Sequence, residues 1–468
     1  MSQLPKGWVN LALGDLCSKL TDGSHNPPKA KESGLPMLSA KNIQNGKLHF
    51  GLGSRLISED EFIVEDKRTR ISQGDVLLTI VGALGRAAVV TTPEKFTLQR
   101  SVAVLHAPLV SPFFLKYSFE SPAFQKQVFD NAKGTAQKGI YLKKLRELSI
   151  SLPSAAEQTR IVEKLDEVLA QVDTIKARLD GIPEILKRFR QSVLAAAVSG
   201  KLTEEWRGSR DYIQYGLQLA KRDQSLDIPE NWKPQKLEDS CGIVSGNAFK
   251  SKDLLDSGDV PVVKISNVQY GKFEVKNQQF LPSSFLDGHK KYLIVEDDLL
   301  MALTRPITNG TLKVCRYPVN QTDGLLNQRV CKFEFKNNEE KNFFELLFQS
   351  SYFKEQVEDN LSETLQPNLS PKDLKRLLVF IPELDEQKEI VRLVDQYFAF
   401  ADTIETQVKK AQARVDKLTQ SILAKAFRGK LVPQDPNDEP ADKLLERIAL
   451  ARKEAEVLAK AAKKTAKK

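Results

Sequence analysis

Two stretches of the chain carry a hydrophobic residue at alternating steps of three and four positions, with charged residues between them. The first extends over 161–193 and the second over 390–422. Such spacing over more than four heptads is typical of a coiled coil, although an amphipathic helix docked on a globular core has the same stripe. We predict two long helices packed antiparallel. Their predicted core positions are Ile161, Leu165, Val168, Val172, Ile175, Leu179, Ile390, Val394, Ile404, Val408, Val415 and Leu418.

A proline interrupts the first stripe but not the second. Because proline removes a backbone hydrogen bond and kinks a helix, Gly181-Ile182-Pro183 predicts a break there. A helix from Ile161 to Val193 would be about 48 Å long at 1.5 Å per residue. One turn of DNA measures about 34–36 Å. The helices are therefore long enough to hold two domains on successive faces of a duplex.

Each helical stretch follows a segment with the pattern of short strands. Residues 35–41, 75–80 and 87–90 are rich in β-branched and aliphatic residues and are bounded by glycine turns. A helix is predicted over 111–131 and a loop over 133–139. The segment from about 228 to 382 repeats this order, so we expect two mixed domains of strands and helices.

The two halves of the chain also share short sequences about 229 residues apart. Gln99-Arg100 returns as Gln328-Arg329, and Gly200-Lys201-Leu202 returns as Gly429-Lys430-Leu431. Upstream the offset drifts by a few residues, as between Gly7-Trp8 and Asn231-Trp232. A period this long indicates two copies of a domain-sized unit. We predict an α+β fold in which two mixed α/β domains alternate with two long helices, with an internal pseudo-two-fold repeat.

Composition places the chain among water-soluble globular proteins of several domains. It has 468 residues, of which 41% are hydrophobic. No apolar run has the length of a membrane span, and the first residues lack the hydrophobic core of a signal peptide. We therefore expect a cytoplasmic protein without membrane association. The four cysteines show no CxxC spacing, and Cys17 and Cys241 occupy equivalent repeat positions, so both are expected to be buried thiols.

The net charge of +9 and the pI near 9.1 are compatible with a polyanionic partner. Much of this charge lies in the Ala/Lys-rich end after residue 450, where Lys and Arg outnumber Glu. Such ends are often frayed helices or solvated tails. Charge alone therefore allows a nucleic-acid partner without requiring one.

No set of residues in the sequence forms a catalytic or metal-binding motif. Asn26-Pro27-Pro28-Lys29 is similar to the Asn-Pro-Pro-aromatic motif of adenine methyltransferases, but it ends in lysine, lacks an upstream glycine-rich loop and has no second copy. Glu65-Asp66-Lys67 has a nuclease-like spacing that arises readily by chance. There is no phosphate-binding loop, and the four histidines are scattered. A surface turn is the expected structure of 26–29.

The loops between predicted elements carry residue types that recognise nucleic acid. Asn, Gln and Arg make paired hydrogen bonds to base edges, whereas Lys typically contacts phosphates. The alternative for each is a turn residue that bonds its own backbone. The candidate DNA-binding residues are Lys41, Asn42, Gln44, Asn45, Arg86, Lys133, Gln137, Lys138, Lys264, Asn267, Gln269, Arg305, Asn309, Gln366 and Asn368.

The chain, with its repeated sequences and its two helical stretches, resembles the specificity subunit of type I restriction-modification systems, particularly the enterobacterial subclass A. The similarity covers essentially the whole chain. It is most specific over 153–206 and over 418–431, which includes Ala424-Lys425-Ala426-Phe427-Arg428-Gly429. Further similar pieces are Lys6-Gly7-Trp8, 42–46 and 74–78.

The resemblance implies a chain that binds double-stranded DNA but is not an enzyme. Each of two target-recognition domains would read one half of a bipartite asymmetric site, and the helices would set the spacer. It implies two modification subunits and two restriction subunits as partners, with S-adenosylmethionine, ATP and Mg²⁺ bound by them and no cofactor on this chain. The alternatives are an adenine N6 DNA methyltransferase and a coiled-coil scaffold without sequence-specific DNA binding.

The expected segments follow from the repeat and the resemblance together. They are target-recognition domain 1 (1–154), a central spacer helix region (155–205), a linker (206–227), target-recognition domain 2 (228–384), a C-terminal spacer helix region (385–432) and a basic helical or disordered tail (433–468).

Overall fold

The computed structural model describes residues 4–134, 138–219 and 222–465. The chain divides into two compact units. Unit 1 comprises residues 1–180 and 410–468, and unit 2 comprises residues 181–409. Two long helices, α6 (Ala155–Val198) and α13 (Leu384–Ala426), contribute one segment to each unit. The fold is mixed helix and strand, as predicted.

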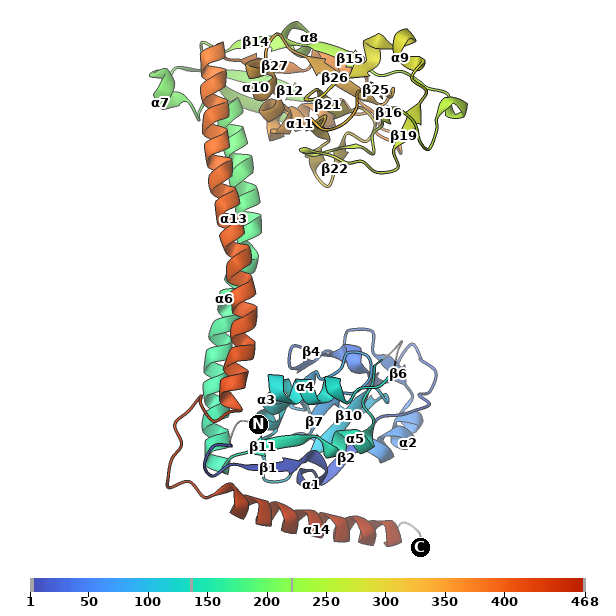
Figure 1. Cartoon of the computed structure of the whole chain (residues 1–468), viewed down its shortest axis with the longest axis vertical. Helices are drawn as coiled ribbons and strands as arrows, with labels where there is room; N and C mark the ends of the chain where they lie inside the picture. The colour runs from blue at the N-terminus through green and yellow to red at the C-terminus, as the bar shows by residue number, and fades with distance from the viewer. Residues whose placement is uncertain (1–3, 135–137, 220–221, 466–468) are drawn as a thin grey trace. The chain divides into compact units, whose positions relative to one another are not determined.

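Unit 1 is built around two sheets (Figure 1). Strand β10 lies centrally in a four-stranded antiparallel sheet of order β2-β10-β7-β8, and a three-stranded sheet has the order β6-β3-β9. Leu77, Leu78 and Val104 of the first sheet are fully buried. The strands and 3₁₀ turn are β1 (Val9–Ala12), β2 (Lys19–Asp22), β3 (Leu35–Leu38), η1 (Ala40–Asn42), β4 (Ile43–Gln44), β5 (Lys47–Leu48), β6 (Arg55–Ile57), β7 (Val76–Thr79), β8 (Ala87–Val89), β9 (Thr97–Leu98), β10 (Val102–His106) and β11 (Ser149–Leu152).

The helices of unit 1 cover this core. The predicted helix over 111–131 is two helices, because Ser121 caps a new helix through its hydroxyl and Pro122 occupies the first helical position. The helices are α1 (Leu13–Leu16), α2 (Glu59–Thr69), α3 (Pro112–Glu120), α4 (Pro122–Asp130), α5 (Leu142–Glu147) and α14 (Ala441–Thr465).

Unit 2 contains two four-stranded sheets. Their orders are β15-β26-β21-β24 and β19-β16-β25-β20, and an aromatic cluster that includes Phe343, Phe348 and Phe353 packs in the core. The elements are α7 (Glu204–Arg207), β12 (Tyr212–Leu219), β13 (Arg222–Pro229), β14 (Lys233–Lys236), α8 (Leu237–Ser240), β15 (Gly242–Ser245), η2 (Ser251–Asp253), β16 (Val260–Val263), β17 (Val268–Gln269), β18 (Lys272–Phe273), β19 (Gln279–Leu281), α9 (Phe285–Gly288), η3 (Lys290–Tyr292), β20 (Leu293–Ile294), β21 (Leu299–Ala302), β22 (Ile307–Thr308), β23 (Thr311–Leu312), β24 (Val314–Arg316), β25 (Gly324–Leu326), β26 (Val330–Glu334), α10 (Asn338–Gln349), α11 (Ser351–Asp359), α12 (Pro371–Arg376) and β27 (Leu378–Ile381).

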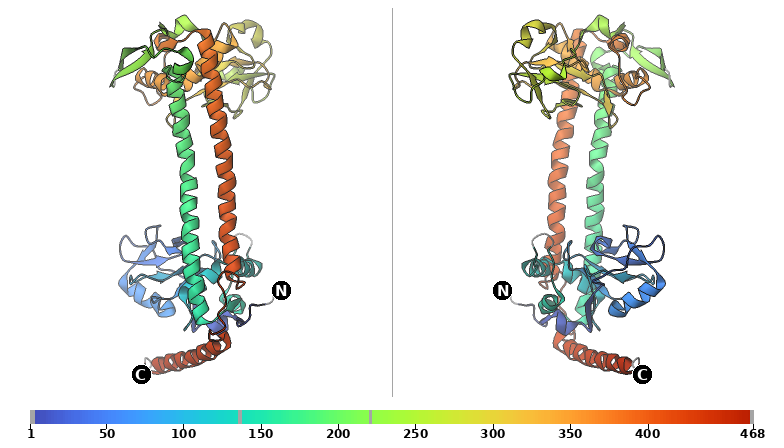
Figure 2. Two further views of the ribbon diagram at one scale, coloured as in Figure 1. Left: turned by 90° about the vertical axis from the view of Figure 1, so that its left-hand side faces the viewer. Right: turned by 90° about the vertical axis from the view of Figure 1, so that its right-hand side faces the viewer.

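Segments of α6 and α13 lie side by side in each unit (Figures 1 and 2). In unit 1, Lys176 Nζ lies 2.9 Å from Asp416 Oδ1. In unit 2, Arg190 Nη2 lies 2.6 Å from Asp402 Oδ1, and the rings of Phe189 and Tyr397 meet edge to face. The predicted core positions divide by burial into six that are buried (Ile161, Leu165, Val172, Ile390, Val394, Val408), four that are half-buried (Val168, Leu179, Ile404, Val415) and two that are exposed (Ile175, Leu418).

One predicted feature differs in the structure. Helix α6 continues through Pro183, so the predicted break is wrong; Leu186 and Val193 beyond it are buried and anchor the helix. The segment 206–227, predicted as a linker, contains most of the β12–β13 hairpin, in which Tyr215 packs on Phe380. The segment 433–468, predicted as a basic helical or disordered tail, contains α14 over 441–465, in agreement with the helical alternative.

Helix α14 is anchored at its start, where Ala441, Leu444 and Ile448 are buried. The four cysteines are free and buried, which confirms the prediction for Cys17 and Cys241. Among the helices described, none combines the length and apolar composition needed to cross a bilayer.

Candidate nucleic-acid interface

The structure joins two of the predicted loops in each unit. In unit 1 the loop after β7 contacts the 133–139 loop, since Gly82 N donates to Lys138 O across 3.0 Å and Val81 pairs with Gly139. In unit 2 Arg305 N donates to Pro367 O across 2.7 Å, and Thr304 pairs with Asn368. The loop that carries each candidate arginine is therefore held against a second loop of candidate residues.

Lys133, Lys138 and Arg86 of unit 1 are exposed. The backbone of Lys133 is fixed by two hydrogen bonds with Gly139, each 2.8 Å long. The backbone of Lys133 is consequently held in place, and its exposed side chain suits a phosphate contact. Gln137 lies outside the described residues.

Arg86 lines a groove of about 680 Å³ within unit 1. Its neighbours Lys116 and Lys176 are already paired, with Glu120 at 3.1 Å and with Asp416 at 2.9 Å. The Arg86 side chain has no hydrogen bond or ion pair to any residue that the structure describes. Its five donors are therefore free for a base edge or a phosphate.

Asn42 and Asn267 are corrections to the predicted interface. Asn42 is fully buried and its amide bonds Ser39 N at 2.9 Å and His49 O at 3.0 Å. Asn267 is also buried, with equivalent bonds to Lys264 N and to Glu274 O at 2.9 and 2.8 Å. Because all of these bonds close a local turn, neither amide is available to DNA, and the turn-residue alternative holds for both.

Gln44 and Gln269 are half-buried and serve the same turns. Each donates its side-chain amide to the carbonyl three residues earlier, at 2.9 Å to Lys41 and 3.1 Å to Ser266. Lys41 itself is exposed beside them. These glutamines retain only part of their hydrogen-bonding capacity for a partner.

Asn45 and Asn309 are exposed and occupy hairpin turns with left-handed backbone. Their φ angles are 50° and 52°, and each precedes a glycine that also has positive φ, Gly46 and Gly310. An Asn-Gly pair is the preferred sequence of such a tight turn. The turns project from the β4–β5 and β22–β23 hairpins.

Of the other candidates in unit 2, Arg305, Gln366 and Asn368 are exposed on the joined loops. Lys264 is different, because its ammonium bonds the side chain of Gln279 and is half-buried. Burial lowers the pKa of Lys264 below its ordinary value. Lys264 is therefore a poorer phosphate contact than its sequence position suggests.

Sequence reasoning missed Arg100 and Leu365. Arg100 is exposed and lines a cavity with Lys133 and Tyr141 in unit 1. Its signal was present in the repeated Gln-Arg dipeptide at 99–100 and 328–329. Leu365 is fully exposed within the loop that carries Gln366 and Asn368, and no sequence pattern marked it.

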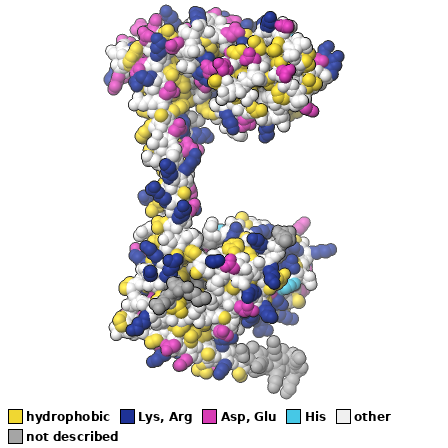
Figure 3. Space-filling model, viewed as in Figure 1, with side chains coloured by type: hydrophobic (Ala, Val, Ile, Leu, Met, Phe, Trp, Pro, Cys, Tyr) yellow, Lys and Arg dark blue, Asp and Glu magenta, His cyan; other side chains and the backbone are white. Residues whose placement is uncertain are grey.

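The two units differ in charge. Unit 1 has 39 Lys and Arg against 27 Asp and Glu, whereas unit 2 has 31 against 34. On the face shown in Figure 3, the charged side chains of unit 1 are mostly basic and those of unit 2 are of both signs. Long-range attraction to a polyanion is consequently concentrated in unit 1.

No group of three or more His, Cys, Asp or Glu that could hold a metal occurs within the described ranges. Asn26 lies in an exposed bend, as expected for a surface turn.

Comparison with known proteins gives the family. The model of the type I restriction modification DNA specificity domain matches twice, at residues 5–184 and 229–412. The chain is 32% identical over 456 residues to the type I restriction enzyme EcoKI specificity subunit of Escherichia coli K12, covering 94% of this chain and 92% of the relative. It is 29% identical over 453 residues to the StySPI specificity subunit of Salmonella potsdam, covering 94% and 92%.

Solved structures agree on the fold. The HsdS subunit from Thermoanaerobacter tengcongensis superimposes with a TM-score of 0.56 at 18% identity, covering 92% of this chain and 98% of that one. With the family model matching most of the chain, this protein belongs to the type I restriction-modification DNA specificity family.

Proposed function

We propose that this chain is the non-catalytic specificity subunit of a type I restriction-modification complex. Each unit would read one half of a bipartite, asymmetric DNA target through its joined loops. The observation that carries the proposal is the double match of the specificity domain, at 5–184 and 229–412, together with one exposed arginine-bearing loop in each unit. The two half-sites should differ, because Arg86 and Arg305 have different neighbours.

We further propose that α6 and α13 form an antiparallel coiled coil within a pseudo-two-fold repeat. The inter-helix ion pairs of Lys176 and Arg190 support this pairing, as does the edge-to-face contact of Phe189 with Tyr397. In this arrangement the helices set the spacer between the half-sites and dock two modification subunits. Two restriction subunits complete the complex for cleavage.

The chemistry belongs to those partners in this proposal. S-adenosylmethionine would bind the modification subunits for adenine N6 methylation, and ATP and Mg²⁺ would bind the restriction subunits. The chain itself would bind no cofactor and act in the cytoplasm.

Methylation mapping of genomic DNA in cells with and without this chain tests the proposal. The expected result is adenine methylation at one bipartite motif that disappears when the chain is deleted. Methylation that persists without the chain, or that marks an uninterrupted motif, would contradict it. Binding of S-adenosylmethionine by the isolated chain would instead favour the methyltransferase alternative.

A further inference from the structure

Glu386 is a buried glutamate in the first turn of α13, and side chains of unit 2 donate hydrogen bonds to its carboxylate. Glu386 is 1% exposed. Its Oε2 accepts from Trp232 Nε1 at 3.1 Å, and its Oε1 accepts from Arg207 Nη1 at 2.6 Å and from the Thr203 hydroxyl at 2.8 Å. Asn231 adds a long contact of 3.5 Å. Each carboxylate oxygen therefore has a partner.

The corresponding glutamate of unit 1 is buried without that set. Glu157 is 4% exposed, and its Oε2 accepts from Trp8 Nε1 at 3.0 Å. Its Oε1 is buried and has no hydrogen-bond partner in the part of the chain that the structure describes. Burial raises the pKa of Glu157, against the opposing hydrogen bond from Trp8. A buried carboxylate oxygen without a donor is costly and calls for an explanation.

The sequence explains which donors are missing. In the register of the helical repeat, Thr203 corresponds to Val432 and Arg207 corresponds to Pro436. Upstream, Asn231 corresponds to Gly7. Apart from the tryptophan, every side chain that reaches Glu386 is thus replaced in unit 1 by one without a polar group. Unit 1 therefore keeps the glutamate and its tryptophan partner but lacks the other hydrogen-bond donors that unit 2 has.

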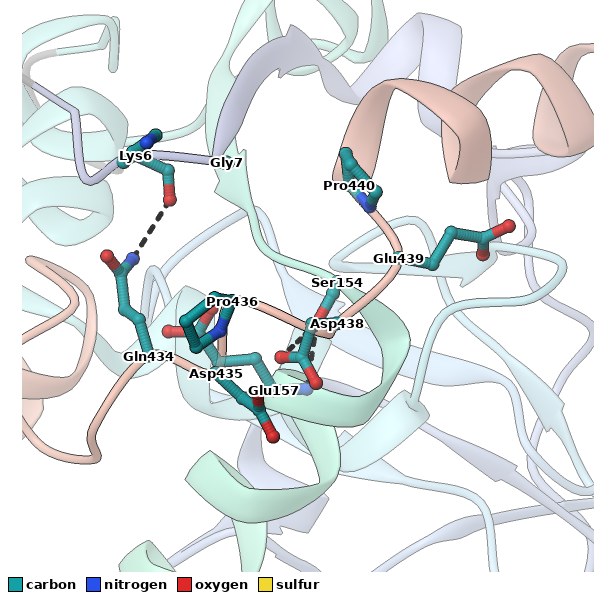
Figure 4. A pocket seen from close by; sticks show the side chains of 10 residues that line it. All are labelled: Lys6, Gly7, Ser154, Glu157, Gln434, Asp435, Pro436, Asp438, Glu439 and Pro440. Atoms are coloured by element: carbon teal, nitrogen blue, oxygen red, sulfur yellow. Dashed lines mark hydrogen bonds between the residues drawn. The ribbon is translucent and has the colours of Figure 1, made fainter.

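A cavity lies where these donors are absent (Figure 4). It measures about 280 Å³, and Gly7, Glu157 and Pro436 are among its lining residues. Asp435, Asp438 and Glu439 also line it, and their negative charges outnumber the single positive charge of Lys6. Asp438 is satisfied by Arg160 at 2.6 Å and by the Ser154 hydroxyl at 2.9 Å, and it fixes the wall of the cavity. The space is acidic, partly apolar and larger than the roughly 30 Å³ that one water occupies.

We propose that this cavity binds the guanidinium group of an arginine side chain from a modification subunit. A planar guanidinium satisfies a carboxylate oxygen while its remaining N–H groups reach further acceptors, which a compact ammonium does less well. Unit 2 already holds such a group, Arg207, against Glu386. The identity of the partner rests on the proposed function, whereas the preference for a guanidinium rests on the cavity alone.

The first experiment uses the whole chain labelled with 5-fluorotryptophan and titrated with ethylguanidinium chloride, an analogue of the arginine end. Fluorine NMR resolves Trp8, Trp206 and Trp232, the three tryptophans of the chain. We expect a saturable shift of the Trp8 signal and none of the Trp232 signal, whose glutamate is already paired. Ethylammonium should act at least about ten-fold more weakly. Three outcomes would overturn the proposal: an unchanged Trp8 signal, equal shifts at Trp8 and Trp232, or equal action of ethylammonium, which would show that the cavity does not prefer a guanidinium.

Two variants make the result specific. Pro436→Arg places a guanidinium where Arg207 stands in unit 2, and Glu157→Gln removes the charge. Both should abolish the Trp8 response. Asn437→Arg is the matched control, because it adds the same charge at an exposed neighbour that does not line the cavity. Loss of the response in the control as well would overturn the assignment of the site.

The second arm adds the modification subunit. Assembly should shift the Trp8 signal as ethylguanidinium does, and Pro436→Arg should weaken assembly about ten-fold relative to Asn437→Arg. Assembly without a Trp8 shift overturns the proposed partner, even if ethylguanidinium binds. Absence of any assembly contradicts the proposed function instead, and the ethylguanidinium result then stands alone.

Discussion

The indole nitrogen of Trp232 donates a 3.1 Å hydrogen bond to the carboxylate of Glu386, 154 residues later in the chain. Both side chains are 1% exposed. The bond ties the segment that enters the sheets of unit 2 to the first turn of α13. It therefore fixes the chain just before β14 relative to the unit-2 segment of α13. Trp8 and Glu157 make the same connection in unit 1 at 3.0 Å.

Glu386→Gln should destabilise the chain much more than Glu157→Gln. Removing the charge of Glu386 leaves the buried guanidinium of Arg207 without its counter-ion, which typically costs about 3–5 kcal/mol. Within the described part of the chain, no ion pair or hydrogen bond reaches the free oxygen of Glu157, and glutamine retains an acceptor for Trp8. We expect a loss below about 1 kcal/mol, or a gain, for Glu157→Gln.

Urea denaturation followed by tryptophan fluorescence measures both variants. Glu386→Gln with Arg207→Met serves as the control, since it removes both charges and should recover part of the loss. Equal losses in the two single variants would show that the donors around the two glutamates do not differ in energy.

The pattern of the chain predicted much of this framework. Val76–Thr79 and Ala87–Val89 form strands inside the predicted segments 75–80 and 87–90, because β-branched and aliphatic runs between glycines have few other stable conformations. The long helices were also predictable, since their spacing of hydrophobic residues extends over many turns. The local spacing of hydrophobic residues is sufficient to predict such helices and strands.

The details of the sites were not predictable, because they depend on distant residues. Whether Asn42 faces solvent or closes a turn is decided by His49 and Ser54, which a motif does not specify. The unpaired oxygen of Glu157 results from Val432 and Pro436, nearly 280 positions later in the chain. Helix α6 passes Pro183 because tertiary packing on both sides outweighs one lost hydrogen bond.

Asp75 should make the stability of unit 1 sensitive to acid. Burial opposes its charge, but hydrogen bonds from His106 and Lys19 hold the pKa of Asp75 below its ordinary value. The unfolded chain therefore binds this proton at higher pH than the folded chain does. The stabilisation is complete above the unfolded pKa, roughly 3.9, and is lost as the pH falls through the folded pKa.

Denaturation of the wild type and of Asp75→Asn between about pH 6 and pH 2.5 measures this effect. The difference in unfolding free energy between the two should shrink as the pH falls. A difference that stays constant over this range would mean that Asp75 acts through packing and not through its charge.

Arg86→Ala and Arg305→Ala should each impair recognition of one half-site only. A side chain that makes paired hydrogen bonds to a base contributes about 1–3 kcal/mol of discrimination, which is roughly 5- to 150-fold in affinity. Both arginines are exposed on loops held by backbone bonds, so truncation should leave the fold intact. Competition binding of the assembled complex to duplexes altered in one half-site reports which half is affected.

Arg68→Ala is a suitable control for unit 1, because Arg68 already bonds the backbone and carboxylate of Asp22. It should leave half-site preference unchanged. If Arg86→Ala weakens binding to all duplexes equally and reduces the salt dependence, Arg86 contacts phosphate and does not read a base.

Insertion of one heptad into both α6 and α13 at the boundary between the units should change the spacer of the target. Seven residues add about 10.5 Å of helix, which corresponds to roughly three base pairs of a duplex with 3.4 Å per pair. The insertion points after Asp180 and before Lys410 lie where the two units divide. Because seven residues preserve the hydrophobic stripe, the helices can still pair.

Selection of methylated sites from a library of spacer lengths measures the change. A three-residue insertion is the control that breaks the stripe and should abolish activity. An unaltered spacer in the heptad variant, with wild-type affinity, would show that the helices do not determine the distance between half-sites.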